Sequence, residues 1–180
     1  MKTDKILLFE YLMCRLIEWY KEVVSNQQYI NKHFSRLTAL KLLFFVSTIK
    51  DIENENKDLL DIFDKYYAMQ YGPVEIDIYS AIVKDESRLY KFGVHELVQT
   101  SQDTTIFNSL DTQDMNRIDR AISLLKDKNP QIISYPASRL IDISHKWGVW
   151  QNAMFIAAMF GRRCEHMPID SIRENRQFYE

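Results

Sequence analysis

Glycine, cysteine and an excess of basic residues are what this 180-residue sequence lacks most clearly. Its four glycines, at positions 72, 93, 148 and 161, stand too far apart to build a glycine-rich phosphate loop or a dinucleotide-binding fingerprint. Its two cysteines, Cys14 and Cys164, form no framework of spaced pairs, which is typical of proteins from a reducing compartment. These absences disfavour the common nucleotide-binding classes and predict a cytoplasmic location.

Charge is nearly balanced, with 23 basic and 25 acidic residues and a net charge of −2. A protein whose main ligand is nucleic acid normally carries an excess of Lys and Arg to neutralise phosphates. The first apolar stretch is interrupted by Glu10, Arg15 and Glu18, and the second, 37–49, contains Lys41 and is too short to cross a bilayer. We therefore expect no secretory signal, and neither nucleic acid nor a membrane as primary partner.

Apolar residues make up 46% of the chain and aromatic residues 13%, enough for a core that needs no metal or disulfide. We predict a mainly α fold, a compact helical bundle forming one domain over 1–180. An N-terminal amphipathic helix and linker would occupy 1–34, and the other elements 35–180. Residues 36–50 are apolar almost all round and predict a buried central helix. The segment 89–98, with Gly93 inside it, fits one short β-hairpin.

The remaining helices are predicted from apolar residues at helical spacing and from end signals. The first would begin at a cap on Thr3 or Asp4 and carry Glu10 on its polar face. Others would cover 59–71, 112–128 after a cap on Asp111 or Thr112, 136–148 with Gly148 as its end, 150–160, and a short stretch capped by Asp170 or Ser171. Ser35 would cap the central helix.

The segment 71–75 is the most distinctive local feature. Glycine, here Gly72, favours the position just past a helix, and proline, here Pro73, the first position of the next helix. Glu75 and Asp77 would then lie in the first turn, where carboxylates interact favourably with the helix dipole. We therefore predict a rigid turn between two packed helices.

A metal site has little support. Zinc in structural sites is held by four ligands, usually with paired spacing. Cys164 and His166, even with His145 or His33 added, do not make that pattern. We interpret them as residues of a surface loop and expect no metal and no cofactor.

Catalysis has little support as well. Asp142, Ser144 and His145 carry the residue types of a nucleophilic site, but neighbours on a helix point in different directions. The interpretation we favour for His145 is a histidine at a helix end, where its charge or N–H satisfies terminal carbonyls. An enzyme that uses His145 with carboxylates from elsewhere is a weak alternative.

Aromatic residues crowd the middle and the C-terminal third of the chain. Ten tyrosines are many to bury with satisfied hydroxyls, and Tyr and Trp are favoured anchors of interfaces. Candidates for contact with a partner are Tyr66, Tyr67, Tyr90 and Trp147. A cluster formed by Trp147, Trp150, Phe155 and Phe160 is more typical of a core. Arg162 and Arg163 make too small a basic patch to carry a function.

Three segments together resemble the Panacea-domain family, the SocA-like antitoxins and their phage-associated relatives. They are 37–45 with its internal lysine, 66–79 with its Gly-Pro-Val element, and 140–150 with its Ser-His pair followed by a tryptophan. The motif residues are Leu40, Lys41, Tyr71, Gly72, Pro73, Val74, Tyr79, Ser144, His145 and Trp150. Family members often have a hairpin before the Gly-Pro-Val element, where this chain shows a helical pattern. The segment 150–167 is longer and more apolar than is usual in the family.

The resemblance implies an antitoxin, a protein that binds a toxic partner protein and holds it inactive. The cognate toxin is expected to be encoded next door. Two alternatives on the same scaffold are a proteolytic adaptor, which would deliver its partner to a protease or unfoldase, and a phage-derived regulatory protein. The enzyme that uses His145 is the weaker alternative. The sequence leaves a homodimer open.

Overall fold

The computed structural model describes residues 2–55 and 57–180, and the side chains of all of these except Lys2, Thr3 and Gln27. Its helices are α1 (Lys2–Val23), α2 (Ile30–His33), α3 (Arg36–Thr48), α4 (Ile76–Val83), α5 (Thr112–Lys128), α6 (Ala137–His145), α7 (Gly148–Met159) and α8 (Ile169–Glu174). Short 3-10 turns occupy Gln27–Tyr29, Ile52–Asn54, Thr104–Ser109 and Ile132–Ser134. One sheet has the strand order β2 (Gly72–Glu75), β1 (Tyr66–Met69), β5 (Glu165–Met167), and the other pairs β3 (Tyr90–Phe92) with β4 (Leu97–Gln99).

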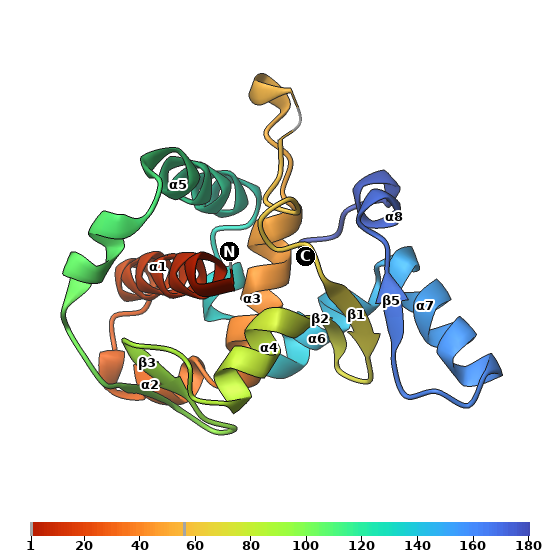
Figure 1. Ribbon diagram of the computed structural model, residues 1–180, viewed down its shortest axis with the longest axis horizontal. Helices are drawn as coiled ribbons and strands as arrows, with labels where there is room; N and C mark the ends of the chain where they lie inside the picture. Colours follow the sequence, from red (N-terminus) through yellow and green to blue (C-terminus); the bar gives the residue numbers. More distant parts are fainter. Residues whose placement is uncertain (1, 56) are drawn as a thin grey trace.

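The helix α3 crosses the middle of the molecule, with α1 and α5 to one side and the three-stranded sheet, α7 and α8 to the other (Figure 1). Eleven of its thirteen residues are buried, as its apolar circumference predicts. Ser47 and Thr48 satisfy their hydroxyls on carbonyls of the preceding turn. The predicted buried helix and the mainly α class are confirmed. A bundle around it is not, because α3 also packs on β2 and the described chain includes two small sheets.

The helix α1 contributes Leu12, Met13 and Leu16 to the core. It begins at Lys2, so Asp4 lies within the first turn instead of capping it; the side chain of Thr3 lies outside the described ones. The placement of Glu10 on a polar face is wrong. Glu10 is fully buried, and one of its carboxylate oxygens accepts backbone N–H bonds from Arg88 and Leu89 at 2.7 and 2.6 Å.

The segment 66–75 is a β-hairpin, so the helix predicted over 59–71 is wrong. Strand β1 pairs antiparallel with β2, from Tyr66 opposite Glu75 to Met69 opposite Gly72, and the two residues between form the turn. Gly72 and Pro73 therefore lie in a strand and do not join two helices. The helix α4 starts only at Ile76, after Glu75.

The reason for this error is that glycine and proline carry the same local signal in both settings. Gly72 has φ +98°, which a hairpin end needs as much as a helix end does. Pro73 faces Ala68 across the ladder. The predicted role of the carboxylates is confirmed in its outline: the Glu75 side chain caps α4 by accepting the N–H of Ile78 at 2.8 Å, and Asp77 lies in the first turn.

Several smaller predictions can be compared with the structure. The hairpin over 89–98 is confirmed as β3 and β4, and α5 begins after Asp111, whose carboxylate accepts the N–H of Gln113. Gly148 begins α7 and does not end the helix before it, because α6 already stops at His145. Ser35 precedes α3 without a capping hydrogen bond, and α8 begins one residue before Asp170. The polar stretch 52–58 includes residue 56, which lies outside the described residues.

Within the described residues, every helix is too short or too polar to cross a bilayer.

Candidate functional site

The three motif segments meet in one buried cluster, although more than 100 residues separate its first member from its last. Lys41 comes from α3, Gly72 and Pro73 from β2, and Ser144 from α6. The Lys41 Nζ donates a hydrogen bond to the Pro73 carbonyl at 2.7 Å. A Cβ on Gly72 would lie 2.3 Å from the Ser144 Oγ and 3.0 Å from the Lys41 Nζ. Only glycine leaves room for α3, β2 and α6 to approach this closely.

Lys41 is the charged residue at the centre of this cluster, and its side chain is fully buried. Burial lowers the pKa of Lys41 to about 7, because the ammonium form loses its hydration. No carboxylate of the described chain forms an ion pair with it. The lysine therefore acts as a hydrogen-bond donor that joins α3 to the hairpin, and its charge is only partly retained at neutral pH.

Ser144 and His145 do not form a catalytic pair. The Ser144 Oγ donates to the Ile141 carbonyl at 2.8 Å inside α6, and its side chain is buried. The His145 ring stacks on Trp150, with ring centroids 3.7 Å apart and planes 9° from parallel. Trp150 in turn donates its Nε1–H to the Met69 carbonyl at 3.0 Å. The pair thus ties α6 and α7 to the hairpin and presents no activated hydroxyl.

The interpretation of His145 as a residue that satisfies helix-end carbonyls is also corrected. Its Nε2 is buried without a hydrogen-bond partner in the described part of the chain. Burial, and next the charge of Lys41, lower the pKa of His145. The ring contributes packing through its stacking on Trp150.

The other motif residues are divided between core and surface. Leu40 and Val74 are buried, Tyr79 packs half-buried against the core, and Tyr71 is 56% exposed at the hairpin turn. Tyr71 is therefore the motif side chain most open to a partner.

The four aromatic candidates for partner contact were Tyr66, Tyr67, Tyr90 and Trp147. Three of them are in the core: Tyr66 and Trp147 have no exposed surface, and Tyr90 is 6% exposed. Their polar atoms have partners inside, because Trp147 donates to the Phe178 carbonyl and the Tyr90 hydroxyl lies 3.0 Å from the Cys14 thiol; the Tyr66 hydroxyl is the exception. These three offer no contact surface in this structure. Contact through the half-buried Tyr67 stays a prediction.

A group of three carboxylates has the geometry of a cation site. Oxygens of Asp64, Glu75 and Asp77 lie within 4.8 Å of one another. The ammonium group of Lys5 already stands among them, at 2.6, 2.6 and 3.1 Å. Hydrogen bonds to Asp64 and Glu75 raise the pKa of Lys5 although burial opposes this. Lys5 thus offsets part of the negative charge, Lys65 offsets a further part by pairing with Asp77 at 3.0 Å, and Lys5 ties α1 to the cap of α4.

Sequence reasoning missed Lys5 and Glu10, the two charged residues that connect α1 to distant segments. Their partners stand 59 or more residues away, so no local spacing could have signalled either contact. The one available signal was that both charged residues lie on α1, a helix whose long row of apolar residues indicates close packing against other segments. Cys164 and His166 do not lie together in a loop, because His166 belongs to β5 and pairs with Tyr67 across the sheet.

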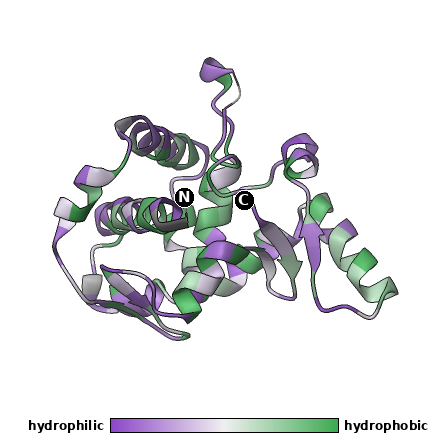
Figure 2. Cartoon of the chain, viewed as in Figure 1, coloured by the Kyte–Doolittle hydropathy of each residue, from purple (hydrophilic) through white to green (hydrophobic). Residues whose placement is uncertain are grey.

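Two members of the aromatic cluster, Phe155 and Phe160, do not lie in the core as predicted, but are exposed at the outer end of α7. Phe155, Ile156, Met159 and Phe160 are 67%, 42%, 66% and 68% exposed, and we call these four residues the α7 tip. The helix buries its opposite side, where small residues such as Ala153 and Ala157 allow close packing on the sheet. Figure 2 shows hydrophobic colouring along this outer helix. A large apolar surface therefore faces outward.

Comparison with known proteins identifies the family of this chain. The family model described as "Antitoxin SocA-like, Panacea domain" matches residues 40–151, well over half of the chain and a range that contains every motif residue. Searches for similar curated proteins and similar solved structures found no match. The chain belongs to the SocA-like antitoxin family with a Panacea domain.

Proposed function

We propose that this protein is an antitoxin that binds a protein toxin directly and holds it inactive. The observation that supports this function is the family match over residues 40–151. The geometry is compatible with it, because the motif residues hold helices and hairpin together instead of forming an open reactive site. Neutralisation by binding needs a rigid scaffold and a contact surface, and no bond has to be made or broken.

The burial of the motif residues favours binding over catalysis. A nucleophilic serine needs a base within hydrogen-bond reach and access for its substrate. Ser144 is bonded to the backbone of its own helix and has no exposed surface. His145 has its ring face covered by Trp150. The enzyme hypothesis therefore gains no support from the arrangement.

Co-expression with the product of the neighbouring open reading frame tests the proposal. That product alone should arrest growth, and this chain should restore growth and co-purify with it at a fixed stoichiometry. A destabilised control is Gly72→Ala, which should lower the amount of folded protein and with it the extent of rescue. Toxicity that this chain leaves unchanged, at equal expression, would contradict the function.

The same experiment separates neutralisation from delivery to a protease. An antitoxin of the proposed kind should let the partner accumulate in a stable complex. A proteolytic adaptor should instead lower the partner's level, and removal of the host unfoldase should restore it. Rescue that disappears in an unfoldase-deficient host would favour the adaptor.

A further inference from the structure

The α7 tip is an exposed apolar surface. Taking roughly 200 Å² for a large side chain, its four residues expose on the order of 400–500 Å². Contiguous apolar patches of that size commonly mark sites of interaction. The tip begins at Phe155, four residues after the last residue that the family model matches. The tip therefore lies outside the matched segment.

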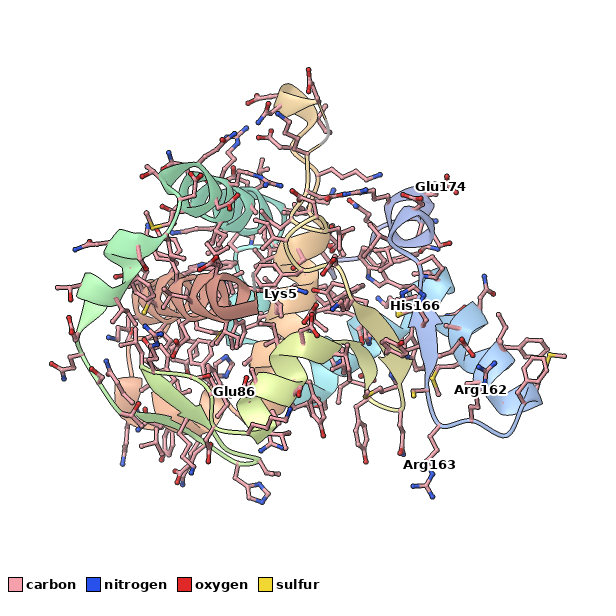
Figure 3. All side chains as sticks on the ribbon, viewed as in Figure 1. Lys5, Glu86, Arg162, Arg163, His166 and Glu174 are labelled. Carbon is pink, nitrogen blue, oxygen red and sulfur yellow. The ribbon has the colours of Figure 1, made fainter. Side chains whose placement is uncertain are left out.

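The tip continues into a hollow between α7, β5 and α8. This hollow measures about 390 Å³, and Ile156 belongs to both surfaces. Its apolar lining also includes Val149, Ala153 and Pro168. The rest of the lining is polar and includes His166 and one carboxylate, Glu174, which stands well away from Arg163 (Figure 3). Because α7 has twelve residues, the combined surface runs for about 18 Å along the helix. That length suits about three turns of a second helix lying against α7.

Cations flank the outer end of this surface. Arg162 and Arg163 follow α7 after Phe160 and Gly161, and both are exposed (Figure 3). Arg162 lies over the Phe160 ring, 5.1 Å from its centroid, and pairs with Glu165 at 2.7 Å. Arg163 forms no ion pair within the described residues. The two arginines are too few for a nucleic-acid site, and Glu165 already offsets the charge of Arg162. The exposed Arg163 beside an apolar patch favours a partner with a carboxylate.

A second copy of this chain suits the surface poorly. Two copies meeting tip to tip would bury about 800–1,000 Å² in total, below the roughly 1,200 Å² at which stable interfaces begin. Such a two-fold contact would also bring the unpaired Arg163 of each copy toward like charge. A partner whose contact extends from the tip into the adjoining hollow buries more area than this, and a partner with negative charge pairs with Arg163 instead of repelling it.

We propose that the α7 tip and its adjoining hollow dock an amphipathic helix of the toxin, with apolar side chains against Phe155, Met159 and Phe160 and a carboxylate opposite Arg163. This proposal rests on the antitoxin function and names the surface that carries it. Aromatic anchors with an arginine at the margin are the usual residues that dominate interface energy. Apolar side chains at positions i and i+3 or i+4 of the toxin helix would lie on one face of it and cover the tip.

The first test uses the purified full-length chain and the neighbouring open reading frame's product. The double variant Phe155→Asp/Phe160→Asp should weaken the affinity at least about 100-fold and abolish growth rescue. The matched control is Val94→Asp/Val98→Asp, which changes two exposed apolar residues of the hairpin formed by β3 and β4 and should alter affinity less than about twofold. Arg163→Glu should cost about tenfold and reduce the dependence on salt.

A second test needs no toxin. Two helical peptides of about 14 residues, with leucine at i, i+3, i+4 and i+7, carry either glutamate or lysine at the other positions. The glutamate peptide should bind the wild-type chain at least about tenfold more tightly than the lysine peptide. The Phe155→Asp/Phe160→Asp chain should bind neither. Equal binding of both peptides, or binding that the double variant retains, would overturn the docking surface.

The two tests separate failure of the surface from failure of the function. If the wild-type chain and the double variant neutralise the toxin equally, the antitoxin function stands and the surface is wrong. If the peptides behave as expected but the neighbour's product is not neutralised, the surface stands and the function is wrong. Sedimentation of the chain alone gives one further result. A dimer that the double variant dissolves would assign the tip to a second copy and overturn the proposal.

Discussion

The motif cluster and the α7 tip are opposites in chemistry, although both are rich in residues that attract attention in a sequence. Around Lys41 and Gly72 the side chains are buried and bonded to backbone carbonyls. At Phe155 and Phe160 large rings face outward without an internal partner from the hydrophobic core. The first region positions helices and hairpin relative to one another, and the second presents surface. The buried motif residues of this protein therefore belong to its scaffold, and among the motif side chains Tyr71 is the one that offers the most exposed surface.

The largest effect that would test this division is expected at Trp147. Its indole is fully buried, with the Phe44 ring 4.9 Å away, and it donates to the Phe178 carbonyl. Trp147→Ala should lower the free energy of unfolding by about 3–5 kcal/mol, because a large cavity opens and a buried carbonyl loses its donor. Urea unfolding followed by far-UV circular dichroism measures it. A loss below about 1 kcal/mol would show that the indole is not a core residue.

Gly72 comes next in expected size. Gly72→Ala forces a Cβ to 2.3 Å from the Ser144 Oγ at a backbone φ of +98°, so steric overlap adds to backbone strain. We expect a loss of about 3 kcal/mol. Gly161→Ala is the matched control, since Gly161 also has positive φ, +64°, but no atom of the described residues lies within 4 Å of its added Cβ. The control should cost about 1 kcal/mol. Equal losses in both variants would mean that the motif cluster is not tightly packed.

How far the sequence alone leads can be judged from particular elements. The helices α3 and α5 follow from apolar periodicity and a capping aspartate, which are local signals. The hairpin at 66–75 was predicted wrongly as part of a helix. Each of its strands has four residues, so the alternation typical of a strand repeats only twice, and the apolar residues from position 59 onward favoured a helix. The Gly72-Pro73 pair did not correct this error, because it is as compatible with a turn between two helices as with the start of strand β2.

The motif cluster itself was beyond local reasoning. Nothing in residues 37–45 indicates that the lysine among them would face a hairpin 32 positions away. The exposure of Phe155 was not predicted because the local pattern was misleading. An apolar helix is normally buried, and only the packing of Ala153 and Ala157 on the sheet decides which side of α7 is covered.

The pH dependence of stability tests the burial of Lys41. Its pKa is about 7 in the folded chain against 10.5 when exposed, so between these values the unfolded chain binds more protons. Stability therefore rises with pH in this window. The gain from pH 7 to pH 9 should be about 2 kcal/mol, and Lys41→Met should remove it. The lowered pKa of His145 acts below this window, and the high pKa of Tyr90 above it. Parallel stability curves for the two proteins would contradict a neutral buried amine.

The smallest effect is expected at the α7 tip, and it is as informative as the largest. Phe155→Asp/Phe160→Asp should change the free energy of unfolding by less than about 0.5 kcal/mol, because both rings are about two-thirds exposed and leave no cavity. The variant should also be more soluble, since it removes apolar surface. Differential scanning calorimetry of the wild type, the tip variant and Trp147→Ala compares their melting temperatures directly. If the tip variant melts far below the wild type, the rings support the fold and the contrast between scaffold and surface fails. If its melting temperature is unchanged, any loss of partner binding reports on contact alone.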